Sequence, residues 1–545
     1  MKTVRWMFLG AVAAVLAGCG AEEIASPGSG GNITINPPAG ETTDPTYNVA
    51  DPAVALGGCP GIADPAGLSD AGTIKGPTGE YRVCVLPSLI SRSMTLEKVP
   101  GVLYALNGRT DVGGDCGASV APAGTASPCK LSASATTEAA AVTLTINPGV
   151  VIFAKTGTSW LAVNRGNKIN AVGTASEPIV FTSQDNVLGL ATNSSQGKWG
   201  GVVLLGRAPV TDCNLGGPPG GASQESCWRD TEGSTTAAYF GGNTPADSSG
   251  TMDYVQIRYS GFILGSNVEL QSLTLEGTGS GTVIRHIHSH NSSDDGVEIF
   301  GGRASIRYFV VTGADDDTFD VDTGYQGTIQ YAIGVHKTAF GDSMIELDSA
   351  NASTADTPRT NLHFANFTLV SKGSNSNGVA MLMRGGADVS LVNGVLVAPS
   401  TLPCLKFDGT GTPSINSAAN ATYDKLGPPV FKSVAMQCNT TTPFAGSGGI
   451  TATEVQTTFT AGTAANTFSL ANSLTNVFVD GAAELAVGAT DPKTIDAAFD
   501  TTNYIGAVRD SADTWYQGWT CNSSTANFVA SPDTRSLCTS LPSLL

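Results

Sequence analysis

A repeat of 22 residues constrains the fold of this chain more than any other feature of its sequence. Residues 284–300 align with residues 306–322 without a gap, and the pattern returns at 328–348 after a small insertion. Short strands separated by Gly, Asn and Asp corners at this period are what one coil of a right-handed parallel β-helix requires. One coil cannot bury its own apolar face, so the coils must stack. The predicted fold class is therefore all-β, a right-handed parallel β-helix of about 22 residues per coil.

The alternation of side chains along each strand predicts which residues form the core. Side chains on a strand point to opposite faces in turn. Two inward rows are expected, one of Val297, Phe319 and Ile345 and the other of Ile299, Val321 and Leu347.

A second pair of segments extends the repeat. Residues 365–370 match residues 392–397, which stacks Asn366 over Asn393 and predicts an amide ladder. Leucine-rich repeats share the period of 22 residues, but their leucine consensus is absent.

Ten cysteines remain when Cys19 is set aside, and they fall into five sequential couples separated by long stretches without cysteine. An even number of cysteines suits disulfides, which persist in oxidising compartments. A metal site is the weaker interpretation because no CxxC spacing occurs. The predicted disulfides are Cys59–Cys84, Cys116–Cys129, Cys213–Cys227, Cys404–Cys438 and Cys521–Cys538.

The first residues have the pattern of a signal peptide. Lys2 and Arg5 precede an apolar run from residue 6 to residue 17, which is shorter than the roughly 20 residues that a bilayer span needs. The run ends in Leu16-Ala17-Gly18-Cys19, which resembles the lipobox of bacterial lipoproteins, in which the cysteine carries the lipid. Gly20, rather than Asp, follows the cysteine. By resemblance to sorting in bacteria with two membranes, this favours the outer membrane.

The chain is expected to divide into five parts. The signal peptide is 1–18, and a flexible tether rich in Gly, Pro, Ser and Thr is 19–50. An N-terminal cap with the first coils is expected at 51–135, and the parallel β-helix at 136–400. The last coils, loops and a C-terminal cap are expected at 401–545, because the open ends of a solenoid must be covered. The terminal disulfides are expected to bond these caps.

Several segments resemble a widespread group of bacterial envelope β-helix lipoproteins. The resemblance covers most of the chain after about residue 55. It implies a fold and a location in the envelope, and it brings no catalytic residue to this chain. The segments that carry the resemblance are 144–152, 198–209, 294–302, 315–324, 504–507 and 518–520.

The net charge narrows the range of partners. The chain has a formal charge of −18, and removal of Lys2 and Arg5 with the leader would leave −20. Nucleic acid and anionic lipid surfaces are therefore unsuitable ligands. Divalent cations, and neutral or basic partners such as a glycan or another envelope protein, stay open.

Carboxylates are the strongest candidates for a functional site. Glu298, Asp320 and Glu346 are expected to lie side by side on the face opposite the core rows, with Asp322 and Asp348 two places further along. Adjacent coils are about 4.8 Å apart, a spacing at which like charges oppose ionisation. Ca²⁺, which takes six to eight oxygen ligands, is the natural counter-ion for these five residues. The corner acids 294–295 and 316–317 are interpreted mainly as turn-bonding residues.

The same carboxylates also support an enzyme hypothesis. Many β-helix proteins of similar architecture cleave acidic polysaccharides, and the diagonal from Glu298 to Asp322, about 8 Å, suits an inverting glycosidase pair. Glu298, Asp320 and Asp322 are then the catalytic candidates, with only His336 and Lys337 as basic partners near the next coil. The preferred function is a binding, adhesive or accessory structural role in a calcium-stabilised envelope protein. The alternative is a polysaccharide-active enzyme, hydrolase or lyase, acting on an acidic glycan.

Two aromatic and histidine clusters have simpler interpretations. His286, His288 and His290 lie on one strand face, where a stacked or hydrogen-bonded row is favoured over a transition-metal site. Trp515, Tyr516 and Trp519 are interpreted as the bulk that covers the last coil rather than as a platform for sugar rings.

Overall fold

A computed structural model gives the fold of most of the chain. It describes residues 57–119, 129–130, 138–213, 215–216, 227–265, 268–338, 340–349, 357–373, 378–411, 413–462, 465–528 and 536–542. The predicted signal peptide, the predicted lipid attachment site at Cys19 and the predicted tether up to residue 50 lie outside these residues. Within the described part, no helix is long and apolar enough to cross a membrane.

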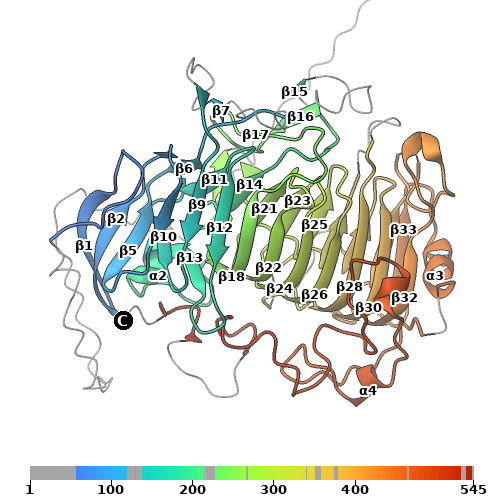
Figure 1. The fold of residues 1–545 in the computed structure, drawn as a ribbon. Coiled ribbons are helices and arrows are strands. Elements are labelled where there is room, and N and C mark those ends of the chain that lie inside the picture. Colours follow the sequence, from blue (N-terminus) through green and yellow to red (C-terminus); the bar gives the residue numbers. More distant parts are fainter. Residues whose placement is uncertain are drawn as a thin grey trace, which may run out of the picture. The chain divides into compact units, whose positions relative to one another are not determined.

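Two long sheets form the body of the protein, parallel except for the first pair of strands, and from residue 250 onwards each coil adds one strand to each sheet (Figure 1). Sheet A follows the order β1 (Ser69–Gly76), β2 (Gly79–Val85), β5 (Val102–Leu106), β10 (Val151–Ala154), β13 (Ile179–Ser183), β18 (Gly250–Arg258), β22 (Val283–His290), β24 (Ser305–Thr312), β26 (Thr328–Val335), β28 (Asn361–Val370), β30 (Asp388–Val397) and β32 (Val430–Gln437), with β4 (Met94–Leu96), β9 (Thr143–Ile146) and β12 (Lys168–Val172) beside this path. Sheet B follows the order β3 (Leu89–Ile90), β6 (Arg109–Val112), β11 (Trp160–Val163), β14 (Val202–Leu205), β21 (Leu273–Glu276), β23 (Val297–Phe300), β25 (Asp320–Asp322), β27 (Ile345–Leu347), β29 (Met381–Met383), β31 (Leu405–Asp408) and β33 (Phe444–Ser447).

The remaining elements are short. Three small sheets are formed by β7 (Cys129–Lys130) with β8 (Glu138–Ala139), by β15 (Leu215–Gly216), β16 (Cys227–Asp230) and β17 (Tyr239–Phe240), and by β19 (Ile263–Gly265) with β20 (Val268–Glu269). The described helices are α2 (Gln184–Val187), η2 (Ala421–Tyr423), α3 (Ala452–Thr460), α4 (Ala482–Leu485) and η3 (Pro492–Thr494).

The strand register confirms the predicted period. Val283 pairs with Ser305 in sheet A, and Glu298 pairs with Asp320 in sheet B, both 22 residues apart. The insertion then lengthens the next step, so that Asp320 pairs with Glu346. The two predicted inward rows are fully buried in one continuous apolar core, as expected for coils that stack to hide their apolar faces.

A row of left-handed residues runs across sheet A and is not evident in the apolar pattern. One residue in each of seven successive strands has a positive φ, between 49° and 63°, and is left out of the strand register, as in a β-bulge. The first four carry stacked rings, with centroids 4.1, 4.6 and 4.8 Å apart. Asn tolerates this backbone conformation better than most residues, which suits two of the later positions. The row consists of Tyr254, His286, Tyr308, Tyr331, Asn366, Asn393 and Ser433.

Helix α3 lies within the part of the chain where the C-terminal cap is expected and packs on the last coil, with Phe459 against Phe431 and Phe444. The aromatic cluster at 515–519 does not lie there, contrary to the expectation. The residues after helix α3, 465–528 and 536–542, form a segment that we call the C-terminal strap. It runs back along the outer face of sheet A towards the N-terminal coils, as the orange-to-red chain shows in Figure 1. Trp515, Tyr516 and Trp519 pack on Val310, Ile333 and their neighbours in sheet A.

The two asparagines of the left-handed row hold the strap in place. We expected Asn366 and Asn393 to form an amide ladder with each other. Instead, Asn366 Nδ2 donates hydrogen bonds to the carbonyls of Tyr504 and Gly506 in the strap. Asn393 exchanges hydrogen bonds with the backbone of Thr490. The bulge turns these amides outwards, so they satisfy strap backbone groups that have no strand partner.

The five predicted disulfides are present. Two of them, Cys59–Cys84 and Cys116–Cys129, lie in the N-terminal coils, and Cys213–Cys227 closes the excursion that leads into β16. Cys404–Cys438 joins the last coils, and Cys521–Cys538 lies within the strap. Since Arg258 donates a hydrogen bond to the carbonyl of Cys538, this last disulfide sits against the middle of sheet A rather than at the end of the stack.

Candidate functional site

Carboxylates surround a cavity of about 430 Å³ on the outer side of sheet B, which we call the acidic cavity. Ten of the twelve described residues that line it are acidic. They come from β23, β25 and β27, from the corners that precede these strands, and from two excursions of the chain. The lining residues are Glu232, Glu269, Gln271, Asp294, Asp295, Glu298, Asp316, Asp317, Asp320, Asp342, Glu346 and Arg384.

The stacking of coils brings three strand carboxylates together. Glu298, Asp320 and Glu346 occupy paired positions in neighbouring strands, so their backbones are separated by the inter-strand distance of about 4.8 Å. Their neighbours along each strand point into the apolar core. The alternation that buries the core rows thus forces these three acids onto the opposite face.

The corner acids bond the backbone of the next coil and also line the cavity. Asp295 Oδ1 accepts a hydrogen bond of 2.8 Å from the backbone N–H of Asp317. Asp317 Oδ1 in turn accepts one from the backbone N–H of Ser343. The predicted backbone bonding therefore exists, but it links successive coils rather than closing each turn. Both carboxylates also have an oxygen close to those of acidic neighbours.

Three groups of carboxylates have ligand oxygens close enough to share one ion. In each group the oxygens all lie within 4.8 Å of one another. One group combines Asp295 with the strand residues Glu298 and Asp320. The other two are Asp294, Asp295 and Asp316, and Asp316, Asp317 and Asp342. The groups share members and form a continuous acidic surface.

Burial and mutual repulsion make this cluster hard to ionise. Loss of solvation, followed by the charge of Asp320, raises the pKa of Glu298 well above its ordinary value. Burial and neighbouring acids likewise raise the pKa of Asp295 and of Asp317 well above the ordinary range, and that of Asp294 to about 7. Without a counter-ion, burial and mutual repulsion therefore favour the protonated form of these carboxyl groups.

Arg384 supplies the positive charge at one end of the acidic cavity. Its guanidinium pairs with Glu346, and its Nε donates a hydrogen bond of 2.7 Å to Asp348. Burial raises the pKa of Glu346, and the Arg384 charge opposes that rise. The negative charge at the Glu346 end of the acidic cavity is therefore already partly neutralised by the protein itself.

At the Glu298 end of the acidic cavity, the described residues provide no such partner. Glu298 is 8% exposed, and no hydrogen bond or ion pair joins its carboxylate to another residue in the described part of the chain. Asp320 Oδ1 is likewise buried without a hydrogen-bond partner there. A buried carboxylate without a partner is costly, so the acidic cavity is built for a positively charged ligand.

The structure brings together some of the predicted site residues and separates others. Glu298, Asp320 and Glu346 line the acidic cavity as expected. Asp322 and Asp348 are not among the residues that line it, because Asp322 accepts the N–H of Thr323 and Asp348 binds Arg384. Asp295 takes their place beside Glu298 and Asp320.

Several lining residues escaped the sequence analysis. Glu232 and Glu269 lie in excursions outside the repeat, so no alignment of coils could place them at the cavity. Asp342 follows the insertion that breaks the period, but it lies one coil after Asp316, so the repeat could have predicted its place at the cavity. Arg384 follows β29, and no feature of the sequence indicated its role.

The histidine row has a packing role. His286 stacks between Tyr254 and Tyr308, and its Nδ1 lies 2.7 Å from a carboxylate oxygen of Asp253. His288 and His290 are buried and both hydrogen-bond the hydroxyl of Thr312. Burial lowers the pKa of His288 to about 3, so the ring is neutral. Among the described residues, no candidate metal-binding group contains a histidine.

One family model agrees with this architecture. The family described as pectate-lyase like beta helix domain matches residues 126–520. The crystal structure of pectate lyase Pel9A aligns with 76% of this chain and 88% of that chain, at 9% identity and a TM-score of 0.30. No curated protein matches the chain. The family match covers most of the coils and both sides of the acidic cavity, and the chain belongs to the pectate-lyase-like beta-helix domain family.

Proposed function

We propose that this protein is a calcium-binding β-helix protein of the bacterial cell envelope, with a binding, adhesive or accessory structural role. The observation that carries the proposal is the unpartnered Glu298 carboxylate, buried in a cavity lined by ten acidic residues. The cation would neutralise charges that the coil stack places side by side.

The chemistry of the lining selects the kind of cation. The described lining residues offer carboxylate and amide oxygens and no imidazole or thiolate. Oxygen-only sites suit hard cations such as Ca²⁺ and Mg²⁺ rather than zinc or copper. Ca²⁺ accepts six to eight ligands in flexible geometry, whereas Mg²⁺ demands a near-ideal octahedron. The crowded and uneven set around Asp295, Glu298 and Asp320 fits Ca²⁺ better.

The proposed location follows from the N-terminal sequence and the cysteines. Leu16-Ala17-Gly18-Cys19 resembles a lipobox, and five disulfides suit an oxidising compartment. A lipid on Cys19 would anchor the β-helix to the outer membrane, with a glycan or another envelope protein as partner. A chain of charge −18 approaches an anionic partner more readily when bound cations reduce that charge.

Calcium is expected to raise the melting temperature of the protein. A ligand that binds only the folded state, at about 100 times its Kd, stabilises that state by about 2.7 kcal/mol. For a chain of this size, that corresponds to a rise of about 2–3 °C. The measurement is a thermal melt of chelator-treated protein with added CaCl₂, with MgCl₂ and KCl as controls. Identical melting curves in all three salts would contradict the proposal.

A polysaccharide-active enzyme is the second candidate, and the family match favours it. The Glu298 and Asp320 oxygens lie within 4.8 Å of each other, which is closer than the roughly 6.5–9.5 Å of an inverting glycosidase pair. Asp322, the other candidate, lies outside the lining of the acidic cavity. The geometry therefore supports an inverting hydrolase less well than cation binding.

The enzyme candidate predicts that uronic-acid polymers are cleaved. Purified protein incubated with a panel of such polymers, with and without Ca²⁺, should release reducing ends or unsaturated products. The Glu298→Gln variant serves as the control for contaminating activity, because its product release should fall to background. A folded protein that releases nothing from any polymer in the panel would remove this candidate for those substrates.

A further inference from the structure

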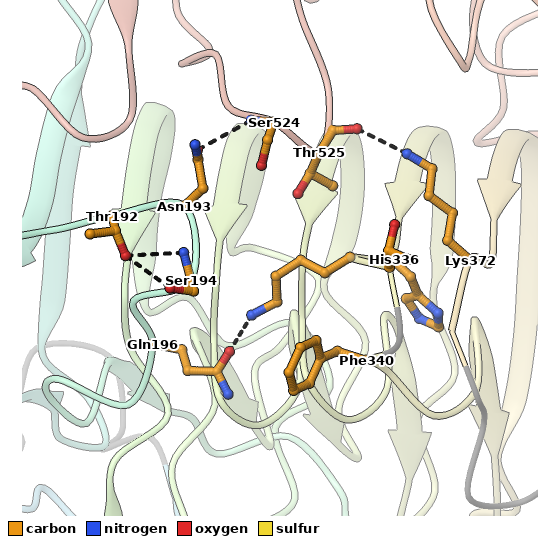
Figure 2. Close-up of a pocket in the computed structure, with 11 residues that line it drawn as sticks. Thr192, Asn193, Ser194, Gln196, His336, Phe340, Lys372, Ser524 and Thr525 are labelled. Atoms are coloured by element: carbon orange, nitrogen blue, oxygen red, sulfur yellow. Dashed lines mark hydrogen bonds between the residues drawn. The ribbon is translucent and has the colours of Figure 1, made fainter.

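A second cavity, of about 650 Å³, lies at the corner between the two sheets and has the opposite character. We call it the basic pocket. The described residues that line it include two lysines and a histidine but no acidic residue. Figure 2 shows how polar side chains from different parts of the chain converge on it. The lining residues are Thr192, Asn193, Ser194, Gln196, His336, Lys337, Thr338, Phe340, Lys372, Ser524 and Thr525.

Four separate parts of the chain build the basic pocket. Residues 192–194 and 196 precede β14, residues 336–338 and 340 follow β26, and Lys372 follows β28. The strap closes the remaining side with Ser524 and Thr525, just beyond Cys521 of the last disulfide. Ser524 N–H donates a hydrogen bond to Asn193 Oδ1, so the strap is fastened across the pocket (Figure 2).

The two lysines bring positive charge into this pocket without a carboxylate partner. Lys337 is 8% exposed, and its ammonium donates a hydrogen bond to Gln196 Oε1. Lys372 Nζ donates a hydrogen bond of 3.1 Å to the carbonyl of Thr525. Within the described residues neither lysine forms an ion pair. An ammonium group carries three N–H donors, so each lysine keeps two for another acceptor.

Asp315, whose charge acts on Lys337, is hydrogen-bonded to a different group. Gln196 Nε2 donates a hydrogen bond to the Asp315 carboxylate while Gln196 Oε1 accepts from Lys337. The amide thus stands between the lysine and the acid. A buried ammonium that lacks an anion in contact is unfavourable, and an entering anion would relieve that cost.

Two further side chains favour a ligand with a polar, ring-containing body. His336 is fully buried, and both of its ring nitrogens lack a hydrogen-bond partner in the described residues. Burial, and next the Lys372 charge, lower the pKa of His336 to about 4, so the ring is neutral at pH 7 and adds no third positive charge. Phe340 is 48% exposed, and Lys337 Nζ lies 5.2 Å from the centre of its ring. An exposed aromatic face beside hydroxyl and amide groups is suited to stacking on a sugar ring.

From this geometry we infer that the basic pocket is a binding site for a small oxyanion, a carboxylate or phosphate group, carried on a hydroxylated body such as a sugar. Lys337 and Lys372 bind the oxyanion, and the Ser, Thr, Asn and Gln side chains bind hydroxyl groups. The volume of about 650 Å³ lies within the range of small-molecule sites. This site is separate from the acidic cavity, and its ligand carries the opposite charge.

The test is ligand binding measured by NMR or calorimetry at pH 7, in the presence of a chelator so that the acidic cavity takes no part. The probes are glucuronate, glucose 6-phosphate, inorganic phosphate and neutral glucose. We expect glucuronate or glucose 6-phosphate to bind more tightly than glucose. Lys337→Gln and Lys372→Gln should each weaken that binding about tenfold or more, because each removes a charge-assisted hydrogen bond.

The matched control is Lys432→Gln. Lys432 also donates a single hydrogen bond to a backbone carbonyl, that of Gly462, but it lies in β32 and outside the basic pocket. This variant should bind the probes as the parent protein does. Binding of phosphate alone would assign the site to the inorganic ion and exclude the sugar body. Failure of all three anions to bind, or equal binding by the parent and both pocket variants, would overturn the inference.

Discussion

Replacing Glu298 with Gln and Asp320 with Asn is expected to stabilise the cation-free protein at pH 8 and to abolish its response to Ca²⁺. Burial and neighbouring charges raise the pKa of both carboxylates in the folded state. A raised pKa contributes stability below the unfolded value, near pH 4, and that contribution is lost as the pH rises through the folded value. The amides carry no charge, so the variant escapes this loss.

The expected change with pH follows from the linkage between pKa and stability. Each buried carboxyl that must ionise in the folded protein lowers the free energy of unfolding as the pH rises, and the double replacement removes both contributions. The measurement is chemical unfolding in chelator at pH 5 and pH 8. The difference in unfolding free energy between variant and parent should grow from the lower pH to the higher one. Addition of Ca²⁺ should then stabilise the parent protein alone.

Asp322→Asn provides the matched control for this variant. Asp322 lies in the same strand as Asp320, two residues further along, but it does not line the acidic cavity. Burial and the Asp348 charge raise its pKa to about 7, so its replacement should also stabilise the cation-free protein at high pH. The Asp322→Asn protein should keep its calcium response. If it loses that response while the double variant retains it, the ligand set is assigned to the wrong residues.

Trp519→Ala is expected to destabilise the protein by about 3–5 kcal/mol, the usual cost of truncating a buried Trp. Trp519 is fully buried, with its ring edge-on to Tyr254 and His286 of the left-handed row. Its backbone carbonyl accepts a hydrogen bond of 2.6 Å from Gln256 in β18. The substitution removes the central contact between the strap and sheet A, so the strap should open before the coils do.

Limited proteolysis measures this opening directly. The Trp519→Ala protein should be cut within 465–528 at protease concentrations that leave the parent protein intact, while the coils stay resistant. Leu485→Ala is the control, because Leu485 also lies in the strap but is 49% exposed. A Trp519→Ala protein with the parent's melting temperature and cleavage pattern would show that the strap is not held by this contact.

The repeat made the coil stack predictable because a parallel sheet repeats its register with the sequence. Two stretches that align without a gap must place equivalent residues in paired positions, as Glu298 and Asp320 are. The inward rows follow from the same register, since alternate side chains share a face. The disulfides followed from the spacing of the cysteines along the chain.

The rest of the site depends on contacts between residues that are far apart in the sequence. Arg384 in the next coil forms an ion pair with Glu346, and the strand pattern does not predict this pairing. Glu232 and Glu269 reach the acidic cavity from excursions that have no counterpart in other coils. The aromatic residues before Cys521 indicated that a large apolar surface had to be covered. They did not indicate which surface. The aromatic cluster was expected on the last coil, and it packs on sheet A instead.

One amide links the basic pocket to Asp315, the residue next to Asp316 of the acidic cavity. Gln196 accepts a hydrogen bond from Lys337 on one side and donates one to Asp315 on the other. Both sites are formed by corners that connect sheet A to sheet B in successive coils.

Diffraction from crystals grown with CaCl₂, measured with the anomalous signal of calcium, tests the central claim most directly. The predicted result is an anomalous peak in the acidic cavity, at about 2.3–2.6 Å from oxygens of Asp295, Glu298 and Asp320. A peak is not expected in crystals of the Glu298→Gln, Asp320→Asn variant. Crystals of the parent protein that show no peak in the cavity at saturating Ca²⁺, or a peak only elsewhere, would contradict the account.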